Sequence, residues 1–214
     1  MLGRVHLIED TSSVPCVIAG GPSSQEMVVT DFTATVSAVL LNNSIPQWWS
    51  GTTPFSISWW LYLDVLPASG AYFALINRAD GASPNAGWGF WVFNDAGTGK
   101  IHVSFADPTN SLTTTTAVST ATWHHIALSW DGTTRRVWVN GTLNSDTPAN
   151  GPTASTNIFY VGRQNGGAPF ERPFDGRMCH LAMWRGFALT QTLVDALRTG
   201  PGGVGTPNRL RFAA

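Results

Sequence analysis

Short runs of apolar and aromatic residues, separated by turn-forming dipeptides, recur along most of this sequence. The run FSISWWLYLDVL (55–66) alternates between two rows, one of which holds Phe55, Ile57 and Trp59. Successive residues of a β-strand point to opposite faces, so this alternation predicts a strand with one face in a core. Similar runs occupy residues 71–78, 87–94, 100–107, 123–130, 135–142, 157–163 and 174–185.

Turn-forming residues stand between nearly all of these runs. They are Asp80-Gly81, Asp95-Ala96-Gly97, Asp131-Gly132, Asn140-Gly141, Asn165-Gly166-Gly167 and Asp175-Gly176. Such pairs adopt the positive φ angles that tight hairpins need. Many short strands at this spacing predict an all-β fold, a two-sheet antiparallel jelly-roll sandwich.

One helix is predicted near the end of the sequence. Thr190 can cap its start, Leu193, Val194 and Leu197 form an apolar stripe, and Gly200-Pro201 ends it. The fold class is therefore a jelly roll with one short C-terminal helix.

The charge content excludes several classes of protein. Only 12% of residues are charged, against roughly 25% in an ordinary soluble domain, and 12 basic residues oppose 13 acidic ones. A nucleic-acid binder needs a basic excess, and a disordered chain combines low hydrophobicity with high net charge. No apolar run approaches the roughly 18 residues that would span a bilayer. We expect neither nucleic acid nor membrane as a partner.

The two ends of the chain lack the regular alternation of the central part and are interpreted separately. Residues 1–50 are interpreted as an N-terminal arm or extra strands, with one or two strands over 26–41. Residues 201–214 are rich in Gly and Pro and then β-like, which predicts a C-terminal tail strand. The N-terminus lacks the apolar stretch of a secretory signal, so we expect an unprocessed chain.

The two cysteines, Cys16 and Cys179, are far apart in the sequence. We expect two free thiols, which pack as small hydrophobes. A bridge between an N-terminal and a C-terminal strand is the alternative that the sequence leaves open.

Three stretches together resemble the laminin-G-like and pentraxin-like group of concanavalin A-like jelly rolls, in the lectin/glucanase superfamily. They are FSISWWLYLD, WHHIALSWDGTTRRVWVNGT (123–142), and FYVGRQNGG followed by FDGRMCHLAMWRGFALTQTLVDAL. The resemblance covers about residues 51–200 and implies the same jelly roll with its short helix.

The resemblance also bears on metal binding. Members that bind calcium often carry an acidic pair in the strand after the Phe-x-Gly motif, and here Cys179 and His180 stand in that place. Neither is a hard oxygen ligand, so we expect no calcium and no other cofactor.

Catalytic residues are not evident. Glycanases of this fold carry acids at alternate positions of one strand, whereas the three Glu residues here, at 9, 26 and 171, are scattered. His124 and His125 are interpreted as strand residues, with His124 inward and His125 outward. We expect a protein that is not an enzyme.

The aromatic surplus suggests a binding surface. On outward rows we place Trp60, Tyr62, Trp91, His125, Arg136, Trp138, His180 and Trp184, with Asn140 nearby. If they share one sheet face, the rings would stack on sugars and the polar groups would bond hydroxyls. The alternative, which we favour, is that loops, residues 1–50 or a neighbouring subunit cover these rings.

Three functions follow as hypotheses. The first is a non-catalytic structural subunit of a virion surface, capsid-decorating or tail-associated in a phage, made in the host cytoplasm and bound to other protein subunits or copies of itself. The second is a carbohydrate-binding module, which would be extracellular. The third, a polysaccharide-cleaving enzyme, needs two carboxylates converging in a cleft.

Overall fold

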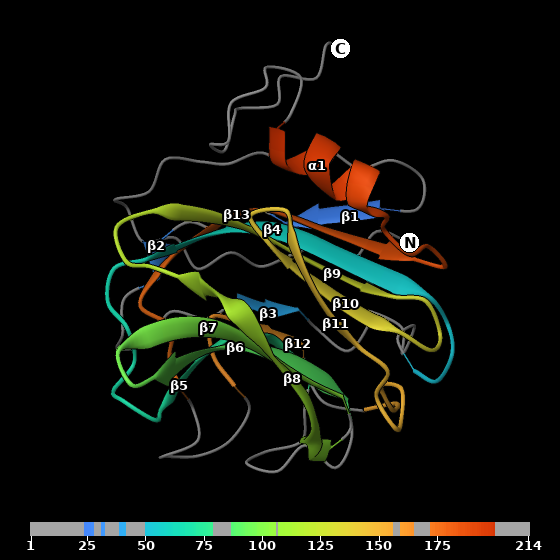
Figure 1. The fold of residues 1–214 in the computed structure, drawn as a ribbon, viewed down its shortest axis with the longest axis horizontal. Helices are drawn as coiled ribbons and strands as arrows, with labels where there is room; N and C mark the ends of the chain where they lie inside the picture. Colours follow the sequence, from blue (N-terminus) through green and yellow to red (C-terminus); the bar gives the residue numbers. More distant parts are fainter. Residues whose placement is uncertain are drawn as a thin grey trace.

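Two antiparallel β-sheets face each other in a computed structural model of the chain (Figure 1). The structure describes residues 24–27, 31–32, 39–41, 50–78, 87–105, 107–155, 159–164 and 172–199. One sheet follows the order β1-β13-β4-β9-β10-β11, with β2 also pairing with β13, and the other follows β3-β12-β5-β6-β7-β8. The predicted jelly-roll sandwich is confirmed.

Apart from β8 and β11, the bounds of the strands from residue 55 onward agree closely with the alternating runs. The seven-stranded sheet contains β1 (Ser24–Met27), β2 (Asp31–Phe32), β4 (Phe55–Leu63), β9 (Trp123–Trp130), β10 (Arg135–Val139), β11 (Thr142–Asp146) and β13 (Gly176–Arg185). The six-stranded sheet contains β3 (Val39–Leu41), β5 (Tyr72–Asn77), β6 (Trp88–Asp95), β7 (Thr98–Phe105), β8 (Asp107–Val118) and β12 (Phe159–Val161).

The core lies between the two sheets and is built from one row of each strand. In β4 the inward row that begins with Phe55, Ile57 and Trp59 has no exposed surface. It meets the inward row of β6, where the rings of Trp59 and Phe90 pack edge to face with centroids 5.1 Å apart. The period-two alternation of the sequence thus fixes which side chains form the core.

Three short segments of the first fifty residues form strands of this sandwich. Strands β1 and β2 extend the seven-stranded sheet beside β13, and β3 extends the six-stranded sheet beside β12. Residues 1–23 and the predicted tail strand at 201–214 lie outside the described residues.

Two of the predicted turn pairs form tight hairpins with positive φ. Asn140 and Gly141 (φ +52° and +83°) join β10 to β11, and Ala96 and Gly97 (φ +49° and +93°) join β6 to β7. The prediction of a turn at Asp175-Gly176 is wrong. Gly176 is the first residue of β13 and lies so close to β4 that an added Cβ would meet the Tyr62 carbonyl oxygen.

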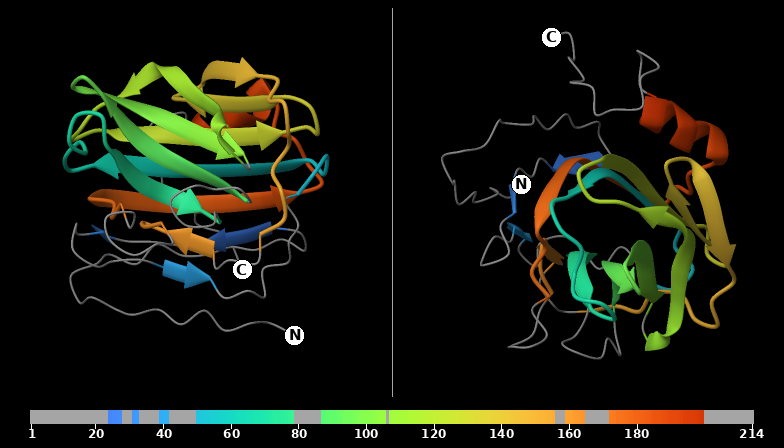
Figure 2. Two further views of the ribbon diagram at one scale, coloured as in Figure 1. Left: turned by 90° about the horizontal axis from the view of Figure 1, so that it is seen from below. Right: turned by 60° about the vertical axis from the view of Figure 1, so that its left-hand side comes forward.

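The predicted helix is α1 (Gln191–Thr199), and it lies on the outer side of the seven-stranded sheet (Figure 2). Thr190 caps it, since its hydroxyl oxygen accepts a hydrogen bond from the Leu193 amide at 3.5 Å and its carbonyl accepts the first helical bond, from the Val194 amide, at 3.0 Å. Only Val194 of the predicted stripe is buried, whereas Leu193 and Leu197 are 39% and 38% exposed. No helix among the described residues is long and apolar enough to cross a membrane.

The described cysteine lies on the outer row of β13. Cys179 is half-buried there and pairs in register with Trp60 of β4. Cys16 lies outside the described residues, so the expectation of two thiols stays a prediction.

Candidate functional site

The eight side chains predicted to bind a ligand do not share one face. Seven belong to strands of the seven-stranded sheet, and Trp91 belongs to β6 of the other sheet. His180 lies in an irregularity of β13, between Cys179 and Ala182, with φ +53°. The single platform drawn from the sequence is therefore corrected, because face assignment from alternation cannot tell one sheet from the other.

Helix α1 covers part of the seven-stranded sheet. Trp138 is 1% exposed, packs with Leu189 and Val194, and donates its indole N–H to Gln191 Oε1 at 2.7 Å. The partly buried Trp184 packs against the same cluster. Covering of these rings was the favoured interpretation of the sequence, and here the cover is the C-terminal helix.

Trp60 and His125 are also closed off, at 4% and 1% exposure. Their rings contact edge to face at 5.3 Å, and His125 Nε2 shares a 2.9 Å hydrogen bond with the Ser58 hydroxyl. Burial, with a smaller effect of the Arg198 charge, lowers the pKa of His125 to about 4. At neutral pH this imidazole is an uncharged part of the packing.

Arg136 is engaged in an ion pair. Its Nη1 lies 2.6 Å from a carboxylate oxygen of Asp131, both side chains being about one-third exposed. Burial acts to raise the pKa of Asp131, but bonds from Thr134, Arg136 and Thr133 outweigh it and hold the pKa well below its usual range. Arg136 thus completes the Asp131 turn.

Tyr62, one of the residues predicted to bind a ligand, is partly exposed and contacts another partly exposed aromatic ring. It is half-buried and its ring lies 5.4 Å from that of Trp123. The Arg177 guanidinium stands over the Tyr62 ring at 4.8 Å and also pairs with Asp64 at 3.4 Å. The cation of this cluster is therefore neutralised by a carboxylate.

A second aromatic group lies on the outer face of the six-stranded sheet. Tyr72 and Phe93 are cross-strand partners on β5 and β6, and their half-buried rings stack with centroids 4.7 Å apart. His102 of β7 meets Tyr72 edge to face at 5.3 Å and Trp91 at 5.9 Å. We call Tyr72, Phe93, His102 and Trp91 the six-strand aromatic face.

Trp91 forms the floor of this face. Its indole lies over Gly89, where an added Cβ would stand 2.3 Å from a ring carbon. Only a glycine two residues earlier on the same row lets the ring lie this close to the sheet. The indole N–H is bonded to Gln164 Oε1 at 2.9 Å, which fixes the ring.

Arg172 supplies the charge at this face. Its guanidinium stands 5.0 Å from the centre of the Tyr72 ring, and its Nη1 donates to Gln164 Oε1 at 3.3 Å. Its carbonyl accepts the Ala74 amide of β5 at 2.8 Å, which ties this residue to the sheet. Its backbone φ of +45° is unusual for a residue other than Gly or Asn, and such backbone strain is concentrated at functional sites.

His102 remains uncharged at neutral pH. Burial, then the positive charges of Arg135 and Arg172, lower its pKa to about 4. Its Nδ1 shares a 2.8 Å hydrogen bond with the Thr113 hydroxyl of β8. The face therefore combines neutral rings with the Arg172 cation, and the Lys100–Asp95 ion pair lies beside Phe93.

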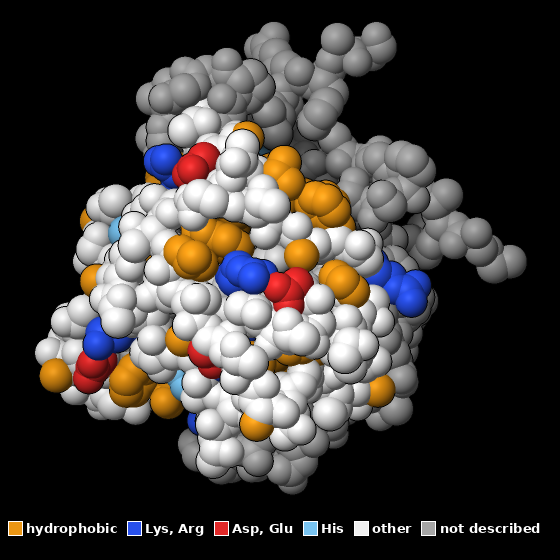
Figure 3. All heavy atoms as spheres, turned by 45° about the vertical axis from the view of Figure 1, so that its right-hand side comes forward, with side chains coloured by type: hydrophobic (Ala, Val, Ile, Leu, Met, Phe, Trp, Pro, Cys, Tyr) orange, Lys and Arg blue, Asp and Glu red, His pale blue; other side chains and the backbone are white. Residues whose placement is uncertain are grey.

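The surface elsewhere carries few charges. Figure 3 shows a side on which backbone and uncharged polar side chains predominate, and hydrophobic side chains lie in small separate groups. A hollow of about 290 Å³ lies at the ends of β8 and β11, lined by Thr109, Asn110, Ser111, Asp146, Thr147, Pro148, Ala149 and Asn150. No aromatic side chain lines it.

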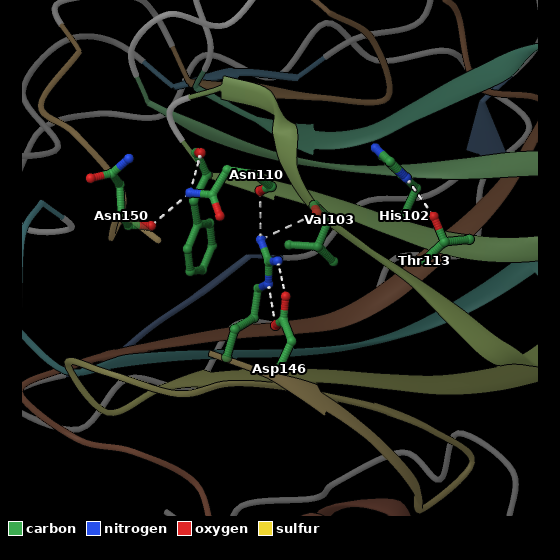
Figure 4. A network of polar contacts seen from close by, with 8 residues as sticks. His102, Val103, Asn110, Thr113, Asp146 and Asn150 are labelled. Atoms are coloured by element: carbon green, nitrogen blue, oxygen red, sulfur yellow. Dashed lines mark hydrogen bonds and ion pairs between the residues drawn. The ribbon is translucent and has the colours of Figure 1, made fainter. Parts of the chain in front are cut away.

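The hollow borders a polar network that joins the sheets (Figure 4). Arg135, with no exposed side-chain surface, donates two hydrogen bonds to Asp146 at 2.9 and 2.5 Å. It also donates to the Asn110 carbonyl at 3.0 Å and stands 4.8 Å from the centre of the Phe105 ring. The network is a clamp between β10–β11 and β7–β8.

Several acidic side chains among the described residues are engaged with cations. Asp64, Asp95, Asp131, Asp146 and Asp195 each form an ion pair with Arg or Lys. In the described part of the chain no group of three or more His, Cys, Asp or Glu could hold a metal ion.

Sequence reasoning missed Tyr72, Phe93, His102 and Arg172. Phe93 had a usable signal, because it lies two residues after Trp91 and so on the same row. His102 and Tyr72 join it only through the pairing of β5, β6 and β7, and Arg172 only through the return of a distant segment to β5.

A two-sheet antiparallel jelly roll is the architecture of the lectin-like sandwiches. The chain belongs to the concanavalin A-like lectin/glucanases superfamily, whose family pattern matches residues 33–195. The match begins before residue 51, where the resemblance read from the sequence began. No curated protein matches this chain.

Solved structures share the fold at low identity. Domain 4 of the extracellular arabinanase AbnA from Geobacillus stearothermophilus, solved with arabinotriose, has a TM-score of 0.57 at 20% identity, covering 91% of this chain and 85% of that one. A Bacteroides ovatus protein described as carbohydrate binding has a TM-score of 0.55 at 18% identity, covering 78% and 46%. A Trypanosoma rangeli sialidase has a TM-score of 0.51 at 15% identity, covering 84% and 28%.

Proposed function

We propose that this chain is a non-catalytic carbohydrate-binding domain whose ligand lies on the six-strand aromatic face. The observation that carries the proposal is the contact of Tyr72, Phe93 and His102 at an outer face, with Arg172 beside them. Sugar rings pack their C–H faces on aromatic rings, and nearby polar groups bond their hydroxyls. The arabinotriose complex of the similar arabinanase domain supports this class of ligand.

The absence of catalysis is part of the proposal. A glycosidase needs two carboxyl groups about 5 to 10 Å apart, one as acid and the other as base or nucleophile. Asp95, the described aspartate at the end of β6, is paired with Lys100 at 2.5 Å. Among the described residues, this carboxylate is thus engaged in an ion pair, which favours binding over cleavage.

The test is binding of the full chain to a panel of immobilised plant, bacterial and animal glycans. Tyr72→Ala and Phe93→Ala are expected to weaken binding roughly tenfold or more, as truncation of an anchoring ring does. Tyr62→Ala is the matched control, since Tyr62 is a half-buried ring under an arginine on the opposite sheet. Loss of binding in Tyr62→Ala with full binding in Tyr72→Ala would move the site to the seven-stranded sheet.

A second proposal, a subunit of a virion surface or other assembly, is favoured by a separate observation. Phe187, Leu193, Leu197 and Leu143 are 38–46% exposed, and they lie on α1, just before it, and on β11. Apolar side chains left at a surface suit burial by another subunit. Copurification of the chain with a particle, and its loss on substitution of these residues, tests this role.

A further inference from the structure

In the described structure, some arginines stand over an aromatic ring and also form an ion pair. Arg172 differs from them. Arg135 lies over Phe105 and pairs with Asp146, and Arg177 lies over Tyr62 and pairs with Asp64. Arg172 lies over Tyr72 and contacts no carboxylate among the described residues. A partly buried cation without a counter-ion is costly, so this position is prepared for an anion.

The geometry of Arg172 suits a carboxylate. Its single hydrogen bond, from Nη1 to the neutral Gln164, leaves Nε and Nη2 without a partner in the described part of the chain. Two N–H groups on one edge of a guanidinium match the two oxygens of a carboxylate. The stacked Tyr72–Phe93 pair lies next to the guanidinium and offers an apolar surface for the ring that carries the carboxylate.

The rest of the face does not oppose an anion. His102 is uncharged at neutral pH, and the nearest described acid on β6, Asp95, is held by Lys100. Arginine has no local preference for the left-handed conformation that Arg172 adopts, and the hydrogen bond from the Ala74 amide holds it there. Such backbone strain is found at ligand-binding positions, which fits an anion-binding role.

We propose that the six-strand aromatic face binds a carboxylate-bearing sugar, a uronic or sialic acid residue, through Arg172. This inference rests on the proposed carbohydrate-binding function and specifies its ligand class. The guanidinium edge takes the carboxylate, Tyr72 and Phe93 take the ring, and the buried Gln164 holds the guanidinium in place.

The experiment compares each acidic glycan with its own carboxyl-reduced form. The probes are oligogalacturonides, hyaluronan fragments and sialyllactose, each next to the neutral product in which –COOH has become –CH₂OH. Wild-type protein is expected to bind at least one acidic probe about tenfold or more tightly than its reduced partner, the value of one charge-assisted hydrogen bond. This preference should weaken as salt rises, because the charges are partly exposed.

Two variants decide whether Arg172 carries the preference. Arg172→Asn removes the charge and keeps a residue that tolerates positive φ, and it should lower acidic binding to the level of the reduced probe. Arg177→Asn, on the opposite sheet, should leave the preference intact. Tyr72→Ala should weaken both members of a pair.

The outcomes separate the two proposals. Equal binding of acidic and reduced probes, unchanged by Arg172→Asn but lost in Tyr72→Ala, overturns the carboxylate inference and leaves the carbohydrate-binding function standing. An acidic preference that survives Arg172→Asn also overturns the inference. No binding to any acidic or neutral glycan of the wider panel overturns the function, and the inference falls with it.

Discussion

His125 shows how a residue that looks functional in the sequence serves the packing. Its ring is 1% exposed, Nε2 is bonded to Ser58, and Nδ1 is buried with no hydrogen-bond partner. Around it stand Trp60 on β4 and the opposite charges of Arg198 and Asp195 on α1. Burial disfavours the charged imidazolium, and it is therefore the main cause of the lowered pKa of His125.

A pH dependence of stability follows from His125. Its pKa is about 4 in the folded chain and 6.5 when exposed, so below pH 6.5 the unfolded chain takes up a proton that the folded chain refuses. Stability is therefore lost as pH falls from about 6.5 towards 4, on the order of 2 kcal/mol for this residue by pH 4.5. His125→Gln should flatten the change in urea midpoint between pH 7 and 4.5. An unchanged slope in the variant would contradict this account.

Residues of the proposed site were only partly predictable. Trp91 was assigned to an outward row correctly, since it and Phe93 alternate with buried Phe90 and Val92. The sequence could not show that Trp138 is covered, because its cover, Val194, lies 56 positions later on an element whose docking depends on the whole sheet. The alternation of residues along a strand identifies its two faces, but contacts between distant parts of the chain decide which faces remain exposed to solvent.

At the scale of the elements, the clamp between β10–β11 and β7–β8 is the feature to test. Asp146→Ala leaves the fully buried Arg135 without its counter-ion, and removal of one partner of a buried pair typically costs about 3–5 kcal/mol. Because Asp146 is itself 30% exposed, we expect the lower end of that range. The measurement is the free energy of unfolding in urea.

Arg136→Ala is the matched control for the clamp. It is the next residue of β10, and its pair with Asp131 is about one-third exposed on both sides. Exposed pairs contribute about 0–1 kcal/mol, so this variant should unfold close to wild type. Equal losses in the two variants would show that the depth of burial does not govern these pairs.

Most strands were predictable because each has one apolar row, and their ends fall within a few residues of the structure. Strand β8 was missed. Its sequence, DPTNSLTTTTAV, is dominated by Thr, and its inward row holds a buried Thr114 whose hydroxyl accepts a hydrogen bond from the Ile101 amide at 3.1 Å. A polar strand at the edge of a sheet gives no hydrophobic period to read.

At the scale of the molecule, the low charge content and the apolar side chains at α1 predict self-association or attachment. Leu193 and Leu197 lie one helical turn apart and are both more than one-third exposed. The wild-type chain should show a concentration-dependent rise in mass by light scattering, and Leu193→Gln with Leu197→Gln should reduce it. A wild-type chain that stays monomeric at high concentration would count against the assembly role.

Helix α1 makes the two outer faces of the sandwich different, because it covers part of one sheet only. Because α1 occupies the outer side of one sheet, a chain anchored through that side presents Tyr72, Phe93 and Arg172 to the medium, and a chain anchored through the other side hides them. With Cys16 and Cys179 replaced by Ser, attachment through one cysteine, Arg198→Cys or Thr113→Cys, would produce surfaces of opposite orientation from the same protein. Capture of a glycan would then depend on which way the molecule stands.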